Sequence, residues 1–163
     1  MITFDKMESR DWKAVKQIYQ EGIAAGNTTF HQSAPDWDEW NNNHLQHSRA
    51  ITKENDDILG WAALTSVSGR CVYAGVAEVS VYESDKAREK GLGKLLLQKL
   101  IEESEANNIR TLQARIFPEN VASIKIHQSF CFRMIGRRDR IGQMNGVWRD
   151  ILLFERRSNK VGL

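Results

Sequence analysis

The chain has 163 residues, close to the length of one typical domain, and its 41% hydrophobic and 27% charged residues are ordinary for a globular protein. Its formal net charge of +2 is too small to predict binding to nucleic acid or to an anionic membrane. No apolar run approaches the roughly 20 residues that cross a bilayer, and the N-terminus lacks a secretory signal pattern, so we expect a cytoplasmic protein. We expect one domain over residues 1–158 and a short tail at 159–163.

Cysteines and histidines are few. Cys71 and Cys131 have neither CxxC spacing nor a nearby histidine pair, so we expect reduced, partly buried thiols rather than a disulfide or a zinc site. His31, His44 and His47 lack a carboxylate or cysteine that would complete a ligand set, and we expect no metal.

The order of predicted elements follows from periodicity and turn-forming residues. Apolar residues recur at helical spacing after Ser9, and Pro35-Asp36 offers the start of a second helix. Alternating segments between turn-forming residues predict strands. In chain order we expect a short strand at 2–4, a helix from Ser9 to about Ala25, a short helix bearing Trp37, Trp40, His44 and Leu45, a hairpin of strands 49–53 and 58–67, a strand at 76–82, a helix from Gly91 to about Asn107, a strand at 112–117, a helix at 120–130, and strands at 132–140 and 147–156.

The strand at 76–82 alternates between an apolar face and a face of mixed chemistry that carries Glu78, Ser80 and Tyr82. Because a helix of about 16 residues follows it, this strand and the strand at 112–117 can be parallel neighbours joined by a right-handed crossover. The other connections suit antiparallel pairing. We therefore expect an α/β fold with a mixed sheet flanked by helices.

The turn from Arg88 to Lys94 reads Arg88-Glu89-Lys90-Gly91-Leu92-Gly93-Lys94 and joins a predicted strand to a predicted helix. Its glycines allow a ligand to approach the backbone, and the free N–H groups of a helix start favour an anion, so the turn suits a pyrophosphate. A Walker A loop would need Gly at 88 and Ser or Thr at 95, and a dinucleotide fingerprint would need Gly at 96, where the chain has Leu96. An ordinary helix start with flexible glycines remains the alternative.

The pattern R-x-x-G-x-G between strand and helix resembles the acetyl-CoA signature of the GCN5-related N-acetyltransferase (GNAT) superfamily. Residues 120–132 resemble the superfamily's later helix and Gly-Phe corner, with Cys131 where Gly is usual. The segment 70–82, His127 and the segment 146–150 resemble the phosphinothricin and methionine-sulfoximine acetyltransferase branch. The resemblance implies a GNAT fold: a mixed, mostly antiparallel sheet with a parallel central strand pair, flanked by helices.

The resemblance also implies an N-acetyltransferase that uses acetyl-CoA as co-substrate and no metal. The acceptor would be the amino group of a small amino-acid analogue such as phosphinothricin, methionine sulfoximine or methionine sulfone, and the protein would form a homodimer. An aminoglycoside, a polyamine or a protein N-terminus remains an alternative acceptor. A module that binds acetyl-CoA without turnover is the alternative outside enzymes.

Two titratable residues are candidates for catalysis. We expect Glu78 to act as the base, directly or through water, although it could instead be a solvated strand residue paired with a cation. His127 lies seven residues after Asn120, close to two helical turns, so both face the same side; its role as proton donor or acceptor is open. The resemblance implies acceptor contacts from Phe30, Arg70 and Tyr73, and cofactor contacts from Val79, Ser80, Val81, Arg88, Glu89, Lys90, Gly91, Leu92, Gly93, Lys94, Asn120 and Ser123.

Overall fold

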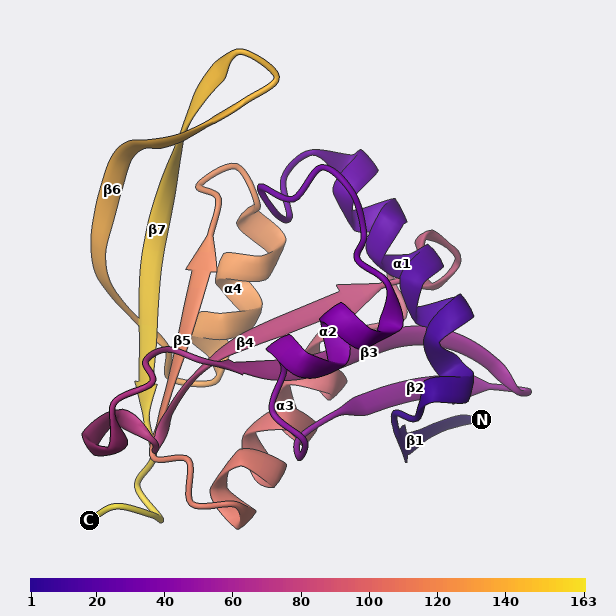
Figure 1. Ribbon diagram of the computed structural model, residues 1–163, viewed down its shortest axis with the longest axis horizontal. Helices are drawn as coiled ribbons and strands as arrows, with labels where there is room; N and C mark the ends of the chain where they lie inside the picture. The colour runs from indigo at the N-terminus through magenta and orange to yellow at the C-terminus, as the bar shows by residue number, and fades with distance from the viewer.

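A seven-stranded sheet with the order β1-β2-β3-β4-β5-β7-β6 runs through the computed structural model, which describes residues 1–163 (Figure 1). All neighbouring strands are antiparallel except the central pair β4 and β5, which is parallel. The strands are β1 (Ile2–Lys6), β2 (Ala50–Glu54), β3 (Asp57–Ser66), β4 (Val76–Glu83), β5 (Thr111–Ile116), β6 (Arg133–Met144) and β7 (Val147–Arg157). The helices are α1 (Trp12–Ala25), α2 (Trp37–Asn43), α3 (Leu92–Ala106) and α4 (Val121–Ser129), with short 3-10 turns at Ser9–Asp11, Cys71–Tyr73 and Asp85–Ala87.

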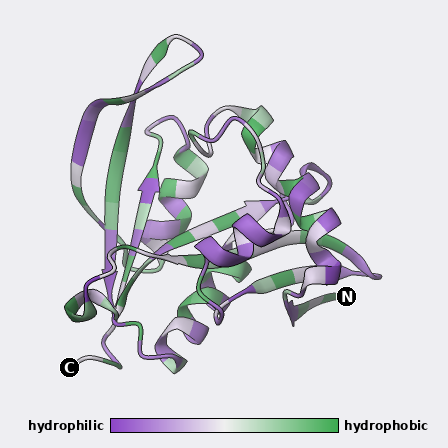
Figure 2. Ribbon diagram, in the orientation of Figure 1, coloured by the Kyte–Doolittle hydropathy of each residue, from purple (hydrophilic) through white to green (hydrophobic).

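Helices cover both faces of the sheet and bury two hydrophobic clusters. On one face α3 packs on β2, β3 and β4 around Leu96, Leu100 and Phe154. On the other face α1 and α2 pack around Trp40 and Trp61. Figure 2 shows that the middle of β7 is hydrophobic whereas the outer strand β6 carries hydrophilic segments. The expected α/β fold with one parallel strand pair is confirmed.

Several predicted boundaries are confirmed by local geometry. The Asp36 carboxylate accepts a hydrogen bond of 2.9 Å from the Glu39 N–H and caps α2. Gly26 ends α1 in the left-handed conformation, with φ of 83°. Asn55 and Asp56 have φ of 52° and 71°, as the two-residue turn of a tight hairpin requires.

Three details of the predicted elements are wrong. Ser9 does not cap α1, because a 3-10 turn precedes that helix and the Glu8 N–H donates a 2.9 Å hydrogen bond to Asp11 Oδ2. His44 lies beyond α2 in an extended conformation. Strand β6 continues to Met144, past the expected end at residue 140, because two irregularities in its pairing with β7 absorb extra residues and let the ladder resume.

The two parallel strands separate in the middle of the sheet. Their pairing covers only Val76 to Glu78 on β4 and Thr111 to Gln113 on β5. Beyond these residues β4 continues to pair with β3, and β5 continues to pair with β7, but not with each other. The backbone groups on the facing edges are therefore left without strand partners at the centre of the fold.

Cys71 and Cys131 are both free, as expected, but both are exposed rather than partly buried. Cys131 adopts a left-handed φ of 67° at the end of α4, the conformation for which a glycine would be favoured. No helix is both long enough and apolar enough to cross a membrane.

Candidate active site

A cavity of about 910 Å³ lies where β4 and β5 separate. Its walls come from the segment between α1 and α2, from α2 itself, from the central strands, from α4 and from the β6–β7 hairpin. The separation of the two strands thus brings together side chains from five parts of the chain. The predicted site residues that line it are Phe30, Glu78, Val79, Ser80, Val81, Asn120, Ser123 and His127.

Glu78 is held by two side chains of β5. Its carboxylate accepts hydrogen bonds of 2.8 and 2.9 Å from the Arg115 guanidinium and a third, of 2.8 Å, from Gln113 Nε2. The parallel register explains the contact, because Glu78 is paired with Gln113 and Arg115 lies two residues further on the same face. The side chain of Glu78 is only 17% exposed. Glu78 is therefore ion-paired, as the alternative interpretation expected, but it lies in the cavity wall rather than in open solvent.

His127 is buried on α4, with 6% of its surface exposed. Its Nδ1 is 2.7 Å from the backbone carbonyl oxygen of Ser123, so Nδ1 carries the proton and donates it. Burial lowers the pKa of His127, and the hydrogen bond to Ser123 opposes that shift. The imidazole is therefore neutral at pH 7, and its Nε2 lone pair can accept a proton.

An aromatic group that was not predicted forms one end of the cavity. Tyr19 and Tyr82 stack on each other and on Trp61, with ring centroids 4.6 to 5.7 Å apart. The Tyr19 hydroxyl also shares a hydrogen bond with Nδ1 of His31. Burial raises the pKa of both tyrosines, so their hydroxyl groups stay protonated at neutral pH. Tyr82 could have been found from the sequence, because it shares the mixed face of its strand with Glu78.

The segment after α2 closes the same end. His44 stacks on Trp40 at 4.0 Å between ring centroids, and its Nδ1 donates to the Trp40 carbonyl oxygen at 2.7 Å. Burial lowers the pKa of His44 to about 4, so this ring is neutral at physiological pH. No group of three or more His, Cys, Asp or Glu side chains could hold a metal ion.

The turn from Arg88 to Lys94 lies outside the walls of this cavity. Gly91 is the N-cap residue before α3, with φ of 72°, and nothing lies within 4 Å of where its side chain would be. The first N–H groups of α3 have no partner within the helix, and with the open space at Gly91 they fit the oxygens of a diphosphate. Arg88 and Lys90 make exposed ion pairs with Asp85 and Glu54. Such pairs are weak enough to exchange for a phosphate.

One carboxylate lies close to this helix start. A side chain on Gly93 would fall 2.3 Å from Glu83 Oε1, so a larger residue there would force the Glu83 carboxylate to move. Burial raises the pKa of Glu83, while the Gly93 N–H and Arg88 oppose the shift. This contact was not predicted, because Glu83 is the last residue of β4 and the turn separates it from α3.

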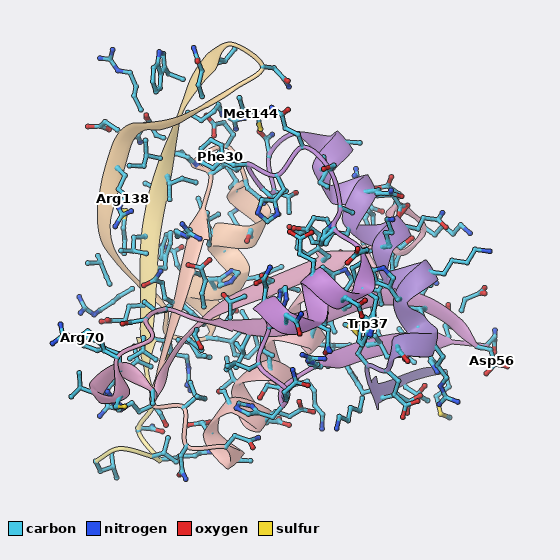
Figure 3. All side chains as sticks on the ribbon, in the orientation of Figure 1. Phe30, Trp37, Asp56, Arg70, Arg138 and Met144 are labelled. Carbon is cyan, nitrogen blue, oxygen red and sulfur yellow. The ribbon has the colours of Figure 1, made fainter.

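The three expected acceptor contacts are not brought together. Phe30 lines the cavity and packs edge-on against Phe117 at 4.9 Å between ring centroids. Arg70 and Tyr73 lie outside the cavity walls, where the Arg70 guanidinium lies over the Tyr73 ring at 5.8 Å. Figure 3 shows Arg70 at the outer edge of the molecule, well away from Phe30.

The acetyltransferase (GNAT) domain family matches residues 6–153, nearly the whole chain. The chain belongs to the GNAT family. A relative at 31% identity over 153 residues is the L-methionine sulfoximine/L-methionine sulfone acetyltransferase of Pseudomonas aeruginosa, with 89% of this chain and 88% of the relative covered. Members of this family transfer acetyl from acetyl-CoA to an amine, and this GNAT protein is an N-acetyltransferase.

Solved GNAT structures share the fold described above. A ribosomal-protein-alanine N-acetyltransferase from Brucella melitensis superposes with a TM-score of 0.89 at 25% identity, covering 96% of this chain and 99% of that chain. A GNAT phosphinothricin acetyltransferase from Sinorhizobium meliloti, in complex with AcCoA, gives a TM-score of 0.88 at 24% identity, covering 99% of this chain and 90% of that chain. At this identity the second likeness shows the fold alone.

Proposed function

We propose that this GNAT protein acetylates the amino group of a small amino-acid analogue, such as phosphinothricin, methionine sulfoximine or methionine sulfone. One observation carries the proposal. Glu78 of β4 and His127 of α4 both line the cavity at the gap between β4 and β5. The named activity of the Pseudomonas aeruginosa relative supports the choice of acceptor.

Acetyl-CoA would supply the acetyl group as a thioester. The backbone of Val79 to Val81, which has no strand partner on its β5 side, would hold the extended arm of this co-substrate. The first N–H groups of α3 would bind its diphosphate, and Arg88, Lys90 and Lys94 would add positive charge. Asn120 and Ser123 line the cavity next to His127 and would contact the same arm.

Glu78 and His127 would divide the proton transfers. An amine must lose its proton before it attacks the thioester carbonyl carbon. The fixed carboxylate of Glu78 would accept that proton, directly or through water, while Arg115 and Gln113 keep it in place. His127 is neutral, so its Nε2 would also act as a proton acceptor at pH 7, and it could donate only after receiving a proton.

We expect the activity to depend on neutral His127. Because burial lowers the pKa of His127 below its ordinary value of 6.5, the fall in kcat at acid pH, where the ring gains a proton, should be centred below pH 6.5 at saturating acceptor. His127→Ala should remove this acid limb of the pH profile. It should also lower kcat at neutral pH by up to about 100-fold, at the low end of general acid–base effects. A pH series of initial rates measures both. His47→Ala is the matched control, because His47 bonds Ser48 outside the cavity; a wild-type limb centred at or above pH 6.5 would contradict the assignment.

A thiol-release assay with acetyl-CoA tests the acceptor. The panel should contain phosphinothricin, methionine sulfoximine, methionine sulfone, a polyamine, an aminoglycoside and a peptide that begins with alanine. We expect release with the first three. Absence of release with all three would refute the proposed acceptor.

A cationic acceptor or a protein N-terminus is the second candidate. Asp36 and Glu39 line the cavity beside α2 and could bind a cation. The Brucella melitensis neighbour is named as an enzyme for ribosomal-protein alanine. Thiol release with only the polyamine, the aminoglycoside or the peptide would favour this candidate.

We infer that the protein forms a homodimer through the β6–β7 hairpin. Exposed apolar side chains gather there, and Figure 1 shows the hairpin extending beyond the body of the sheet. Light scattering should give twice the chain mass of 18.7 kDa, and a single-chain mass at micromolar concentration would contradict the inference. The exposed residues are Met134, Ile135, Ile141, Val147 and Trp148.

A further inference from the structure

Arg138 of β6 lies on the cavity side of the sheet. It is paired with Ile151 of β7, and paired residues of antiparallel strands present their side chains on the same face. Ile151 is buried and lines the cavity, and Arg138 lines it too. Figure 3 labels Arg138 on β6, the strand at the end of the sheet order. Its neighbour Arg137 points to the opposite face, where it pairs with Asp150.

The exposed side chain of Arg138 has no partner for its charge, and unlike Arg140, whose side chain is also unpaired, it lines the cavity. Arg133 bonds Glu155 at 2.7 Å, and Arg149 bonds Asn27 at 2.7 Å. The second arginine in the cavity wall, Arg115, directs two of its donors to Glu78. Arg138 makes no hydrogen bond and no ion pair within the chain, so its guanidinium is available to a ligand in the cavity.

The position of Arg138 limits which part of an acceptor it could bind. Strands β5 and β7 lie between it and Glu78, which separates the two Cα atoms by about 14 Å across the sheet. The register adds roughly 13 Å along the strands, because Glu155 is level with Glu78 and Arg138 is paired with Ile151, four residues further along β7. If the amine lies near Glu78, the α-carboxylate, attached to the same carbon atom, lies near it too. Arg138 therefore meets the far end of the acceptor side chain.

We propose that Arg138 binds an anionic oxygen group, such as a phosphinate or carboxylate, at the end of the acceptor side chain and so selects anionic over neutral acceptors. A guanidinium can donate two parallel hydrogen bonds to such a group. The part of the wall at the start of α2 carries Asp36 and Glu39 and would repel the same group, which favours one orientation of the acceptor. The inference rests on the proposed function, because it assumes an amino-acid acceptor with its amine near Glu78.

Two ligands of similar shape test this role: phosphinothricin, whose phosphinate is charged, and methionine sulfone, whose sulfone is neutral. Arg138→Gln should reduce kcat/KM for phosphinothricin by about 10- to 100-fold, as expected for a lost hydrogen bond to a charged group. The value for methionine sulfone should change less than threefold. Arg138→Lys should restore part of the loss. Arg140→Gln is the matched control, because Arg140 lies on the same strand outside the cavity walls.

Calorimetric titration of each ligand, with CoA present, separates this inference from the proposed function. If wild type binds phosphinothricin with an affinity that Arg138→Gln weakens tenfold or more, the inference stands even when no thiol is released. Equal losses for both ligands, no loss for either, or no binding of phosphinothricin by wild type would overturn it.

Discussion

Glu78→Gln is expected to lower kcat by about 100- to 1000-fold, within the range that a positioned general base contributes. The glutamine keeps the size of the side chain, and its carbonyl oxygen can still accept hydrogen bonds from Arg115 and Gln113. It cannot accept a proton from the amine. The thiol-release rate at saturating acceptor measures the loss, and calorimetry should show acetyl-CoA binding within twofold of wild type.

Two further variants separate the base from its surroundings. Glu155→Gln makes the same change of charge at the residue paired with Gln113, outside the cavity walls, and should leave kcat unchanged. Arg115→Gln removes the main support of the Glu78 carboxylate but leaves the base, so its loss of kcat should be smaller than that of Glu78→Gln. If Glu78→Gln retained wild-type kcat, the proton would have to leave by another route.

The sequence was most informative where one residue's neighbours along the chain decide its environment. Alternation in β4 predicted that Glu78 and Ser80 share a face, and both line the cavity. The pattern of a strand, a helix and a second strand predicted the parallel pair β4 and β5, which the register confirms. Capping of α2 by Asp36 was also predictable, because it depends on residues three apart.

Contacts between distant segments could not be predicted in the same way. Periodicity assigns Arg115 to a face of β5, but its contact with Glu78 depends on which residues pair across the two strands. Arg138 reaches the cavity side next to an irregularity between Arg138 and Gly142, which alternation alone does not reveal. The resemblance that indicated Phe30 also indicated Arg70, which lies outside the cavity walls of the single chain.

Arg49 is a second residue whose importance only the fold makes visible. Arg49 directly precedes β2, and its buried guanidinium turns back to α2 and the segment that follows it. There it donates to the carbonyl oxygens of Asn41, His44 and Leu45 and to Asn41 Oδ1, at 2.6 to 3.1 Å. It also lies 5.1 Å above the Trp40 ring. Arg49 therefore holds the wall of the cavity that α2 provides.

Arg49→Met is expected to lower the free energy of unfolding by about 3 kcal/mol, because the methionine fills part of the space but leaves several buried carbonyl groups without donors. For a chain of this size the loss corresponds to a fall in Tm of roughly 6 to 12 °C. Urea denaturation and thermal melting followed by circular dichroism measure it.

Arg49→Lys should recover only part of the loss, since an ammonium cannot reproduce the planar fork of donors. Arg10→Met, at an arginine whose side chain is 77% exposed, controls for the loss of one positive charge and should leave the midpoint unchanged. A midpoint for Arg49→Met equal to that of Arg10→Met would mean that the packing of Trp40 on Trp61, rather than Arg49, holds α2 over the cavity.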